Sequence, residues 1–588
     1  MSKNLELADV FKKMAVYLKM EDIPFKPEAY EKAALSLQTM SENVEEVYKK
    51  EGKKGLLSIA GIGEGIAEKI IEFLKTGKIK EFEQQKKKIP VDLDGLMLVE
   101  GIGPKAIKAL YQGLKIKSLQ DLEKAAQEGK IRNLENFGEK SEKNILQAIE
   151  FVKKSKGRFL ISEVLAVAEK IIKELKNLKE IEQISLAGSL RRKKETIGDI
   201  DLLATIKKNY PDGAKKIMDV FTTIEGVIKI WDYGLTKSSV RFDLGIDADL
   251  RVVKDYEFGA ALQYFTGSKE HNIRTRKIAL EKGLKLNEYG VFKKGKRVAG
   301  KTEKEIYQII GLDYIEPELR ENTGEIEAAL KHQLPTIIKK DEIKGDLHSH
   351  SDRDGGENSI EEMTLRAMER GYEYFGISDH TKFLRIENGL NEKELLSQHK
   401  EIEQLNRKIQ DTRYKIQILH GCEANILNDG SLDIDDEVLS QLNYVIAGVH
   451  SQMKMTKEQM TERIIRAMKN PNVNIISHPT GRLINRRNEY QIDFDKILKA
   501  AKEYQVALEI NSFPDRLDLN DKNIRKAVAA GVKMVINTDS HHRDHLRFID
   551  FGIAQARRGW ATKKDIINSW KLEKLLAFFK KTGKIDNS

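Results

Sequence analysis

The chain changes its pattern of apolar and polar positions several times along its length. From residue 5 to 50, apolar residues recur every three or four positions, which predicts amphipathic helices, and 151–178 predicts another long helix. Near 181–204 the pattern changes to short apolar runs flanked by charge, which is typical of strands. Beyond residue 341, short apolar runs end in polar clusters and alternate with helical segments. We therefore expect a multidomain protein of α and α+β class.

Glycine turns interrupt the helical N-terminal region. Gly61-Ile62-Gly63 and Gly101-Ile102-Gly103 each precede a helical segment, and residues 136–141 are a weaker copy. A turn of this kind at a helix N-terminus offers backbone N–H groups to a phosphate without reading bases. One such turn is weak evidence, because glycine also starts helices for structural reasons, but two in a basic chain predict helix-hairpin-helix modules. The predicted DNA-binding residues are Gly61, Gly63, Gly101, Gly103 and Lys105.

The composition narrows the class of protein. With 588 residues, 40% of them hydrophobic, the chain can form several folded domains. Charged residues make up 33%, and the net charge of +10 favours a nucleic-acid partner. The single cysteine, Cys422, excludes a disulfide framework and fits a reducing compartment. The N-terminus lacks the apolar core of a signal peptide, and no apolar stretch reaches membrane-spanning length. We expect a cytoplasmic monomer that contacts no membrane.

Two carboxylates, Asp199 and Asp201, end the segment GSLRRKKETIGDID at 188–201. Residues two apart in a strand point the same way, so these side chains would lie side by side. A divalent cation would relieve their repulsion, and Mg²⁺ is commonly held by one or two carboxylates plus substrate phosphates. The Gly-Ser turn and the basic residues after it would bind phosphate. The alternative is a polar hairpin at a sheet edge, but GSLRR favours nucleotidyl transfer.

Several separate segments resemble the family X DNA polymerases. GIGEGIAEKIIEFLKTGKIKEFE, from Gly61, is similar to their small N-terminal domain, and 188–201 matches their palm signature. QYFTGS at 263–268 and NEYGVF at 287–292 match their thumb. The resemblance covers about residues 1–318. It implies a lyase-like helix-hairpin-helix domain at 1–80, a fingers-like helix-hairpin-helix domain at 81–150, a nucleotidyltransferase palm at 151–255 and a thumb at 256–318.

This resemblance implies a polymerase site that uses Mg²⁺ or Mn²⁺. Asp199, Asp201 and a third carboxylate would hold the metals. Strand alternation cannot choose among Asp243, Asp247 and Asp249, but the family pattern DLRVV selects Asp249. Ser189 and Arg192 would bind nucleotide phosphates, Tyr264 and Phe265 would border the sugar, and Asn272 and Arg276 would reach the minor-groove edge. The complete set of implied substrate-binding residues is Gly188, Ser189, Arg192, Gly198, Tyr264, Phe265, Gly267, Asn272 and Arg276.

Some family members use a lysine in the AEKI segment as a Schiff-base nucleophile, and the matching residue here is Lys69. Amine nucleophiles are activated by desolvation or by cationic neighbours, and Lys26 and Lys32 are candidates for that charge. The family's second lysine, four residues earlier, is Gly65 in this sequence. The alternative is that Lys69 contacts a phosphate from the surface.

Histidines dominate the candidate chemistry of the second half. A charged, proline-containing connection at 319–340 precedes it, and ten of the 12 histidines lie between His348 and His545. Six short apolar runs end in His, Asp or Glu, which is typical of ligands at the strand ends of a β/α barrel. A single histidine there is more often structural, but six such endings indicate metals. Mixed imidazole and carboxylate ligands suit Mn, Fe or Zn.

This half resembles the PHP (polymerase and histidinol phosphatase) domain, a distorted seven-stranded barrel with a trinuclear metal centre, at 341–575. Gly355 stands where the family has aspartate, so either Asp354 serves with a shift of one residue or one metal is weakly held. His542 and His545 are expected around the site or on the surface. Arg482, Arg486 and Arg487 either bind the substrate backbone or form a solvated loop. The implied ligands of Mn²⁺ and/or Zn²⁺ are His348, His350, His380, Glu423, His450, His478, Asp539 and His541.

The whole chain thus resembles a bacterial or archaeal-type family X DNA polymerase with a C-terminal PHP domain. The resemblance implies gap filling on gapped or nicked DNA with dNTPs in DNA repair, a metal-dependent 3′–5′ exonuclease, and cleavage at abasic sites. Two alternatives keep different parts of this prediction. In one the PHP domain is structural or positions DNA, and in the other it is a small-molecule phosphatase fused to a DNA-binding half.

Overall fold

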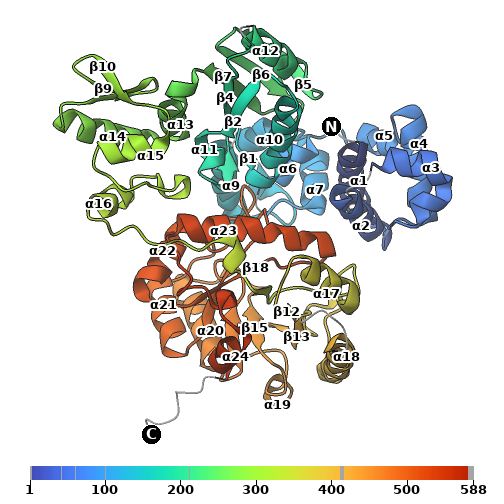
Figure 1. Cartoon of the computed structure of the whole chain (residues 1–588). Coiled ribbons are helices and arrows are strands. Elements are labelled where there is room, and N and C mark those ends of the chain that lie inside the picture. Colours follow the sequence, from blue (N-terminus) through green and yellow to red (C-terminus); the bar gives the residue numbers. More distant parts are fainter. Residues whose placement is uncertain are drawn as a thin grey trace. The chain divides into compact units, whose positions relative to one another are not determined.

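The computed structural model describes residues 3–40, 43–59, 61–99, 101–155, 157–210, 212–410 and 416–580 (Figure 1). The chain divides into two compact units. One is Met1–Lys156 with Asn485–Arg487, and the other is Gly157–Ile484 with Asn488–Ser588. The described part of the first unit is helical, and the second contains five sheets, in the palm, thumb and barrel regions, with the helices packed on them. This matches the predicted multidomain α and α+β class.

The helices of the first unit bury the apolar positions that predicted them. One core contains Phe11, Leu37 and Ile70, and another contains Leu110 and Ile145. Around the first core lie α1 (Lys3–Met20), α2 (Lys26–Thr39), α3 (Val44–Leu57), α4 (Glu64–Thr76) and α5 (Lys80–Lys88). Around the second lie α6 (Leu93–Met97), α7 (Pro104–Leu114), α8 (Leu119–Gln127) and α9 (Glu139–Ser155).

The prediction of one long helix over 151–178 was wrong. Helix α9 ends at Ser155, and α10 (Ile161–Lys176) begins only after β1 (Phe159–Leu160), which pairs with β3 (Thr196–Ile197). Gly157 lies between them at φ +84°, a left-handed conformation that glycine adopts readily and that ends a helix. The helical periodicity on both sides concealed this break.

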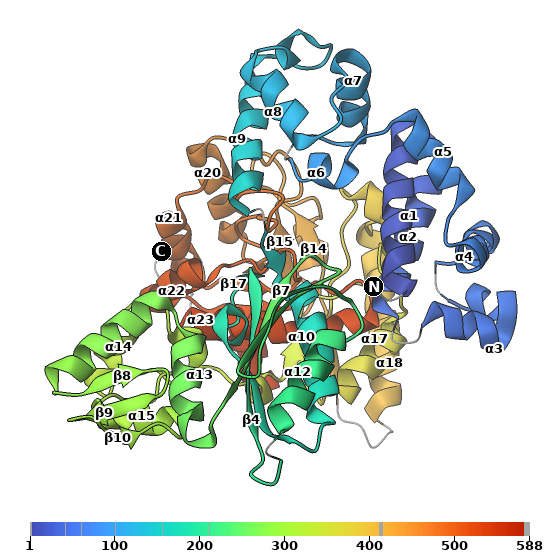
Figure 2. The same ribbon diagram turned by 90° about the horizontal axis from the view of Figure 1, so that it is seen from above.

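A five-stranded sheet forms the centre of the palm region, in the order β2-β4-β7-β6-β5. Ile200, Leu202 and Ala204 alternate along β4 and are buried in one core with α10 and α12 (Gly213–Thr223). Figure 2 shows both helices on one side of β4 and β7. Asp199 and Asp201 therefore face the opposite side. The strands are β2 (Ile181–Leu186), β4 (Asp199–Ile206), β5 (Val227–Tyr233), β6 (Lys237–Phe242) and β7 (Asp247–Val253).

The thumb region continues into a folded connection. Ile326, Ala329 and Ile337 of the predicted linker share a core with Ile306, so this charged segment is packed and not merely exposed. The thumb elements are α13 (Phe258–Thr266), α14 (Lys269–Glu281), β8 (Lys285–Asn287), β9 (Gly290–Lys293), β10 (Lys296–Ala299) and α15 (Glu303–Ile309), followed in the connection by α16 (Glu325–Leu330).

A buried carboxylate, Glu303, joins the thumb to the palm. Its oxygens lie 2.6 Å from Arg191 and 2.5 Å from Arg320, which is fully buried. Burial alone would raise the pKa of Glu303, but the two guanidinium groups outweigh it and lower the pKa to about 2. The carboxylate therefore remains charged and paired at neutral pH.

Replacing Glu303 by alanine should destabilise the second unit by about 3–5 kcal/mol, because Arg320 then stays buried without its counter-ion. Since the folded pKa is lowered, this stabilisation is present above the ordinary value of 4.5 and is lost as the pH falls toward 2. Thermal unfolding of the full chain at pH 7 and pH 3.5 measures both effects. Glu327→Ala is the control, because its ion pair with Arg274 is exposed and worth at most about 1 kcal/mol. Equal midpoints for the two variants would contradict the expectation.

The PHP region is a barrel of parallel strands. β11, β12 and β13 form one sheet, and β14 to β18 form the other. Only Gly421-Cys422 separates β13 from β14, and these two pair with β12 and β15 respectively, so the eight stretches make seven strand positions. His350 N–H donates to the carbonyl of Ser540 at 2.8 Å, which closes the barrel between its first and last strands.

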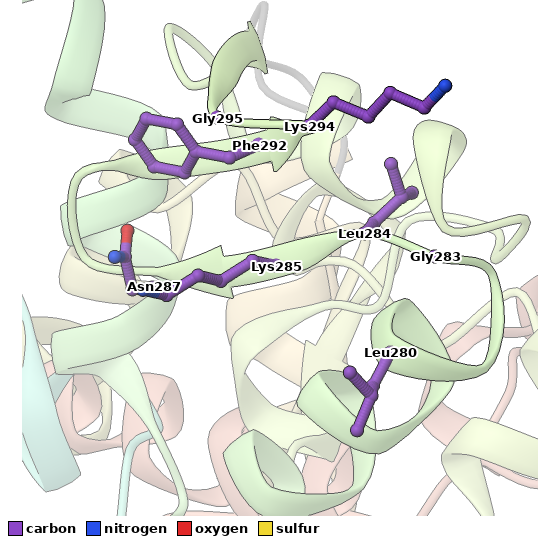
Figure 3. A pocket seen from close by; sticks show the side chains of 8 residues that line it. All are labelled: Leu280, Gly283, Leu284, Lys285, Asn287, Phe292, Lys294 and Gly295. Carbon is purple, nitrogen blue, oxygen red and sulfur yellow. The ribbon is translucent and has the colours of Figure 1, made fainter.

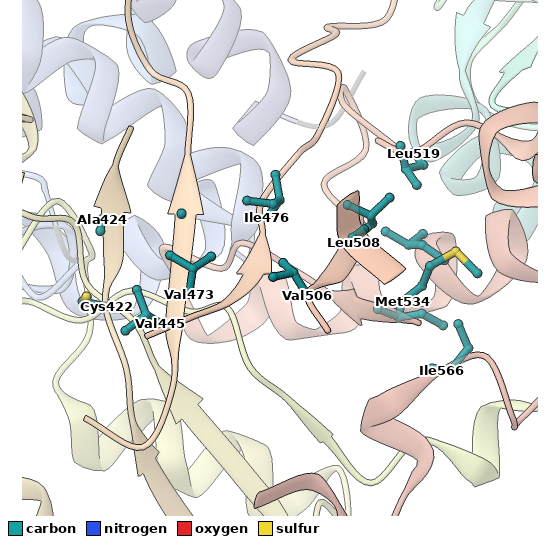
Figure 4. Packing of buried hydrophobic residues seen from close by; sticks show 14 of the residues in the cluster. Cys422, Ala424, Val445, Val473, Ile476, Val506, Leu508, Leu519, Met534 and Ile566 are labelled. Atoms are coloured by element: carbon teal, nitrogen blue, oxygen red, sulfur yellow. The ribbon is translucent and has the colours of Figure 1, made fainter. Parts of the chain in front are cut away.

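Apolar residues of the barrel strands pack against the surrounding helices in one core, part of which is drawn in Figure 4. The strands are β11 (Gly345–Asp346), β12 (Tyr374–Ile377), β13 (Gln417–His420), β14 (Glu423–Asn425), β15 (Val445–Gly448), β16 (Val473–Ile476), β17 (Ala507–Asn511) and β18 (Met534–Asn537). The helices are α17 (Ile360–Glu369), α18 (Glu392–Gln410), α19 (Asp436–Leu439), α20 (Lys457–Lys469), α21 (Phe494–Glu503), α22 (Asp521–Ala530), α23 (Ile549–Arg558) and α24 (Leu572–Phe579).

Candidate functional site

The predicted helix-hairpin-helix turns share one backbone form. Gly61 and Gly101 have φ of +74° and +87°, and Asn136 takes the equivalent conformation at +67° in the third copy. Ile62 and Ile102 are buried between the helices of each hairpin. Gly63 and Gly103 are the N-caps of α4 and α7 and have no side chain that could cover the helix N-terminus. Both turns can therefore present backbone N–H groups to a phosphate.

Lys105 and Lys69 lie on the helices that follow these turns. Lys105 is largely exposed, and its amine lies 2.6 Å from Asp22. The amine of Lys69 lies 3.0 Å from Glu81 and 3.8 Å from Glu72. The charged partners of Lys69 are thus carboxylates, where the sequence suggested Lys26 and Lys32. The role of Lys69 stays a prediction.

The palm carboxylates come from two neighbouring parallel strands. Asp201 on β4 stands directly opposite Asp249 on β7, and Asp199 stands opposite Asp247. Burial raises the pKa of Asp201 to about 7, and the negative charges of Asp199 and Asp249 add to this shift. Burial and the Asp249 charge also raise the pKa of Asp199. Three carboxylates that repel one another on a rigid sheet suit a divalent cation.

The structure also separates the three candidates for the third carboxylate. Asp247 receives two hydrogen bonds of 2.8 Å from Arg241 and one of 2.8 Å from Trp231, so its charge is already neutralised. Asp243 lies in the turn between β6 and β7. Asp249 accepts a hydrogen bond from Ser239 and lies 2.8 Å from Lys237, and its charge acts on both Asp199 and Asp201. This favours Asp249.

The turn before these carboxylates needs glycine. Gly188 has φ of +58°, and a Cβ atom on it would overlap the carboxylate of Asp201, with only 3.1 Å to Cγ. Ser189 lies in the short helix α11 (Gly188–Arg191). Arg192 pairs with Glu321 at 3.0 Å and donates to the carbonyl of Thr266. A Cβ on Gly198 would lie 3.4 Å from Arg158.

Helices α13 and α14 bring the predicted thumb residues together. Tyr264 and Phe265 pack edge to face with 5.1 Å between ring centroids, and the guanidinium of Arg276 lies 5.5 Å from the Tyr264 ring. Asn272 is buried, donates to the carbonyl of Tyr264 at 2.6 Å and accepts from Gln263 at 2.9 Å. In this structure Asn272 therefore orders the turn before α14. Gly267, at φ +67°, lies beside Arg192.

A pocket in the thumb, lined by Leu280, Leu284, Phe292 and neighbouring residues, contains none of the predicted site residues (Figure 3). Its walls are mainly apolar and lysine side chains. We assign it no role in the chemistry.

The implied metal ligands of the barrel converge on Glu423. Its Oε2 lies 2.9 Å from Nδ1 of His380 and 3.3 Å from Nε2 of His348, and its Oε1 lies 3.0 Å from His478 and 3.3 Å from His450. Asp539 lies 3.3 Å from His350 Nε2 and 3.8 Å from His541 Nδ1. All eight predicted ligands are therefore gathered at one end of the barrel.

These residues fit metal ions. Two atoms that each bind zinc at about 2.1 Å are about 3.4 Å apart in a tetrahedron, close to the observed separations. Among the buried atoms described, His348 Nε2, His350 Nε2, His450 Nε2 and Glu423 Oε2 have no hydrogen-bond partner. Burial opposes the ionisation of Glu423, but His348 and the other imidazoles outweigh it and hold the pKa of Glu423 well below its usual range. Such unpartnered atoms of nitrogen and anionic oxygen are suitable ligands for a cation.

Other carboxylates orient these ligands; the sequence prediction missed Glu509 and Asp379 and named Asp354 only as a possible ligand. Glu509 accepts from His348 Nδ1 at 2.7 Å and from the backbone of His478 at 2.8 Å. Asp354 accepts from His350 Nδ1 at 2.7 Å, and Asp379 accepts from Ser351. Carboxylates behind ligating imidazoles fix the ring nitrogen that faces the metal. Glu509 could have been found as a charged residue within the apolar strand Ala507–Asn511.

Arg482 departs from both predicted roles. It is buried and forms an ion pair with Glu195 of the palm at 2.7 Å, so it is neither a solvated loop residue nor free to bind a substrate backbone. Arg486 is exposed. His545 is buried and stacks on Phe548 at 5.0 Å, and His542 caps the following 3-10 turn through its ring. Both histidines thus make contacts within this turn.

Matches to known families span both units. The matched families are a helix-hairpin-helix domain (2–79), a SAM-like helix-hairpin-helix tandem (93–150), DNA polymerase beta palm (158–229), DNA polymerase beta thumb (261–321) and a PHP domain (346–513). The DNA polymerase/3'-5' exonuclease PolX of Bacillus subtilis is 38% identical over 97% of this chain and 98% of its own length. The chain belongs to the family X DNA polymerases that carry a PHP domain. The predicted family and domain types are confirmed.

Other proteins are similar to only part of this family X chain. A probable phosphatase of Clostridium acetobutylicum is 33% identical over 30% of this chain and 72% of its own length. A probable phosphatase of Acetivibrio thermocellus is 32% identical over 33% of this chain and 78% of its own length. The PHP match ends at residue 513, yet β18 completes the barrel and brings Asp539 and His541 to the centre. Within the described residues, none of the helices has the length and apolar character needed to span a bilayer.

Proposed function

We propose that this chain fills short gaps in DNA as a template-directed polymerase and shortens 3′ ends with its PHP domain. Two separate sets of potential metal ligands support the proposal, one on the palm sheet and one at the end of the barrel. The relative whose name states both activities covers nearly the whole chain. The helix-hairpin-helix matches support DNA as the partner.

In the palm the protein positions its substrates and stabilises charge, because phosphoryl transfer needs little acid–base chemistry from side chains. Asp199, Asp201 and Asp249 would hold the metals, and Ser189 and Arg192 would bind the triphosphate of a dNTP. Phosphate oxygens must replace Glu321 as the partner of Arg192. Divalent cations, when bound, would supply Lewis-acid charge and activate the attacking oxygen. We propose Mg²⁺ or Mn²⁺ in the palm and Mn²⁺ or Zn²⁺ in the barrel.

A 5′-labelled primer bordering a one-nucleotide gap tests both activities in one assay with Mn²⁺. We expect extension by one nucleotide when the complementary dNTP is present and shortening of the primer when dNTPs are omitted. A primer that remains unchanged under both conditions would contradict the proposal. Shortening of a 3′-labelled strand to free nucleotide would establish the polarity of the nuclease.

Finer parts of the proposal need their own measurements. Cleavage at an abasic site is proposed for the same barrel centre and is tested on a duplex with a single such site. Borohydride trapping on 5′-deoxyribose phosphate decides whether Lys69 is a nucleophile or a phosphate contact. We propose a cytoplasmic monomer acting in DNA repair, and light scattering measures its oligomeric state.

The alternative functions are less well supported. The probable phosphatases show that similar domains occur without a polymerase, but they cover only part of this chain. A small-molecule phosphatase would leave the palm carboxylates without a role. A purely structural barrel would leave its unpartnered ligand atoms unexplained. Phosphate release from small monoesters, compared with nucleotide release from DNA, separates these possibilities.

A further inference from the structure

The loop that contains Gly355 lies among three histidines of the barrel centre. Asp354 accepts hydrogen bonds from His350 Nδ1 at 2.7 Å and from the backbone N–H of His380 at 2.8 Å. Glu357 N–H donates to the carbonyl of His541 at 2.8 Å. The ligand nitrogens of these three histidines lie within 4.8 Å of one another. The loop around position 355 is therefore hydrogen-bonded to all three of these histidines.

The hydrogen bonds of Asp354 argue against its replacing the missing aspartate by a shift of one residue, although it also lies in a possible ligand group with His350 and Asp379. Its Oδ2 is occupied by His350 and by the His380 backbone, and its Oδ1 accepts from Gly356 N–H at 2.9 Å. Both oxygens are thus used within the protein. Asp354 is a positioning residue that orients the His350 ring.

The space beside Gly355 is filled by another carboxylate. A Cβ atom on Gly355 would overlap Oε2 of Glu387 and would lie 3.3 Å from its Cδ and 3.4 Å from its Cβ. The carboxylate of Glu387 thus occupies the volume that an aspartate at 355 would fill. Glu387 is half-buried, and within the described residues its carboxylate forms no hydrogen bond or ion pair.

The backbone holds Glu387 close to a predicted ligand. It ends the 3-10 turn Arg385–Glu387, whose flanking residues return to His380. Leu390 N–H donates to the carbonyl of His380 at 2.8 Å, and Leu384 N–H donates to Thr381 at 3.0 Å. The turn is therefore fixed to the strand end that carries His380.

We propose that Glu387 supplies the carboxylate ligand that Gly355 cannot, and so completes a divalent-cation site with His380 and His541. This rests on the proposed metal centre of the barrel. An aspartate at 355 and Glu387 in its present position would exclude each other, because a Cβ atom at 355 would overlap the Glu387 carboxylate. The longer glutamate reaches this volume from the neighbouring turn. The chain thus has a complete third metal site despite the glycine.

Binding of Mn²⁺ alone to the metal-free full chain tests the proposal. Calorimetry and the Mn²⁺ retained after dialysis give the number of ions and their affinities. Glu387→Ala should lose one ion, or bind the weakest ion at least about tenfold less tightly. Gly355→Asp in the Glu387→Ala background should restore it. Glu392→Gln is the matched control, because this nearby carboxylate pairs with Lys382, and it should bind as wild type.

The possible outcomes distinguish a failure of the Glu387 site from a failure of the whole metal centre of the barrel. If the wild-type chain retains no Mn²⁺ at the barrel, the proposed metal centre itself fails. If wild type binds and Glu387→Ala binds equally, or if Gly355→Asp gives no rescue, the role of Glu387 is wrong. Glu387→Gln keeps the shape of the side chain and removes only its charge. Comparing its unfolding in EDTA with that of wild type shows whether a loss of metal comes from misfolding.

Discussion

Asp201→Asn should abolish primer extension, with a loss of at least about a thousandfold, and leave 3′ shortening unchanged. Asp201 stands opposite Asp249, and burial, with the added repulsion of Asp199 and Asp249, raises the pKa of Asp201 to about 7. A metal site that loses one charged ligand loses much of the stabilisation of the transferring phosphoryl group. A thousandfold loss corresponds to about 4 kcal/mol.

Single-nucleotide extension under single-turnover conditions is the measurement, with Asp247→Asn as the matched control. Asp247 lies on the same strand as Asp249, but Arg241 already neutralises it, so its loss should cost less than about tenfold. Asp249→Asn should behave like Asp201→Asn. If Asp247→Asn loses extension and Asp249→Asn does not, the third carboxylate has been assigned wrongly.

The palm shows how far local pattern predicts a site. The spacing of Asp199 and Asp201 within an apolar run was enough to predict a strand with both carboxylates on one face, and β4 confirms it. The same alternation could not choose the third carboxylate, because Asp243, Asp247 and Asp249 share a face in sequence. The register between β4 and β7 and the ion pair of Asp247 with Arg241 exist only in the folded structure, and both favour Asp249.

The sequence predictions that were wrong or incomplete also failed because they depended on tertiary structure. The break at Gly157 lies between two stretches that are each helical, so periodicity joined them. Arg482 stands in a basic, polar segment, and its burial depends on Glu195, almost 300 residues earlier in the sequence. Glu387 lies in a loop without any ligand pattern. Only the position of its carboxylate in space, beside Gly355, indicates a role.

Glu423→Gln should remove metal from the barrel and abolish 3′ shortening while extension continues. The two oxygens of Glu423 lie within 3.3 Å of His348, His380, His450 and His478. Glutamine keeps the shape but replaces one anionic oxygen by an amide N–H₂, which cannot bind a cation. Since imidazoles are neutral when they bind metals, Glu423 also supplies much of the negative charge that balances the ions. We expect at least about a thousandfold slower shortening.

Retained Mn²⁺ and nucleotide release from the same preparation measure this effect, with His542→Gln as the control. His542 lies one residue from the predicted ligand His541, but its ring caps a 3-10 turn, so its replacement should leave both metal content and shortening close to wild type. Shortening that persists in Glu423→Gln after metal has been lost would place the nuclease outside the barrel centre. If metal is retained but shortening stops, Glu423 acts in the reaction without being needed to hold the ions. Because the palm carboxylates lie on a separate sheet, unchanged extension in this variant shows that the two activities use separate sites.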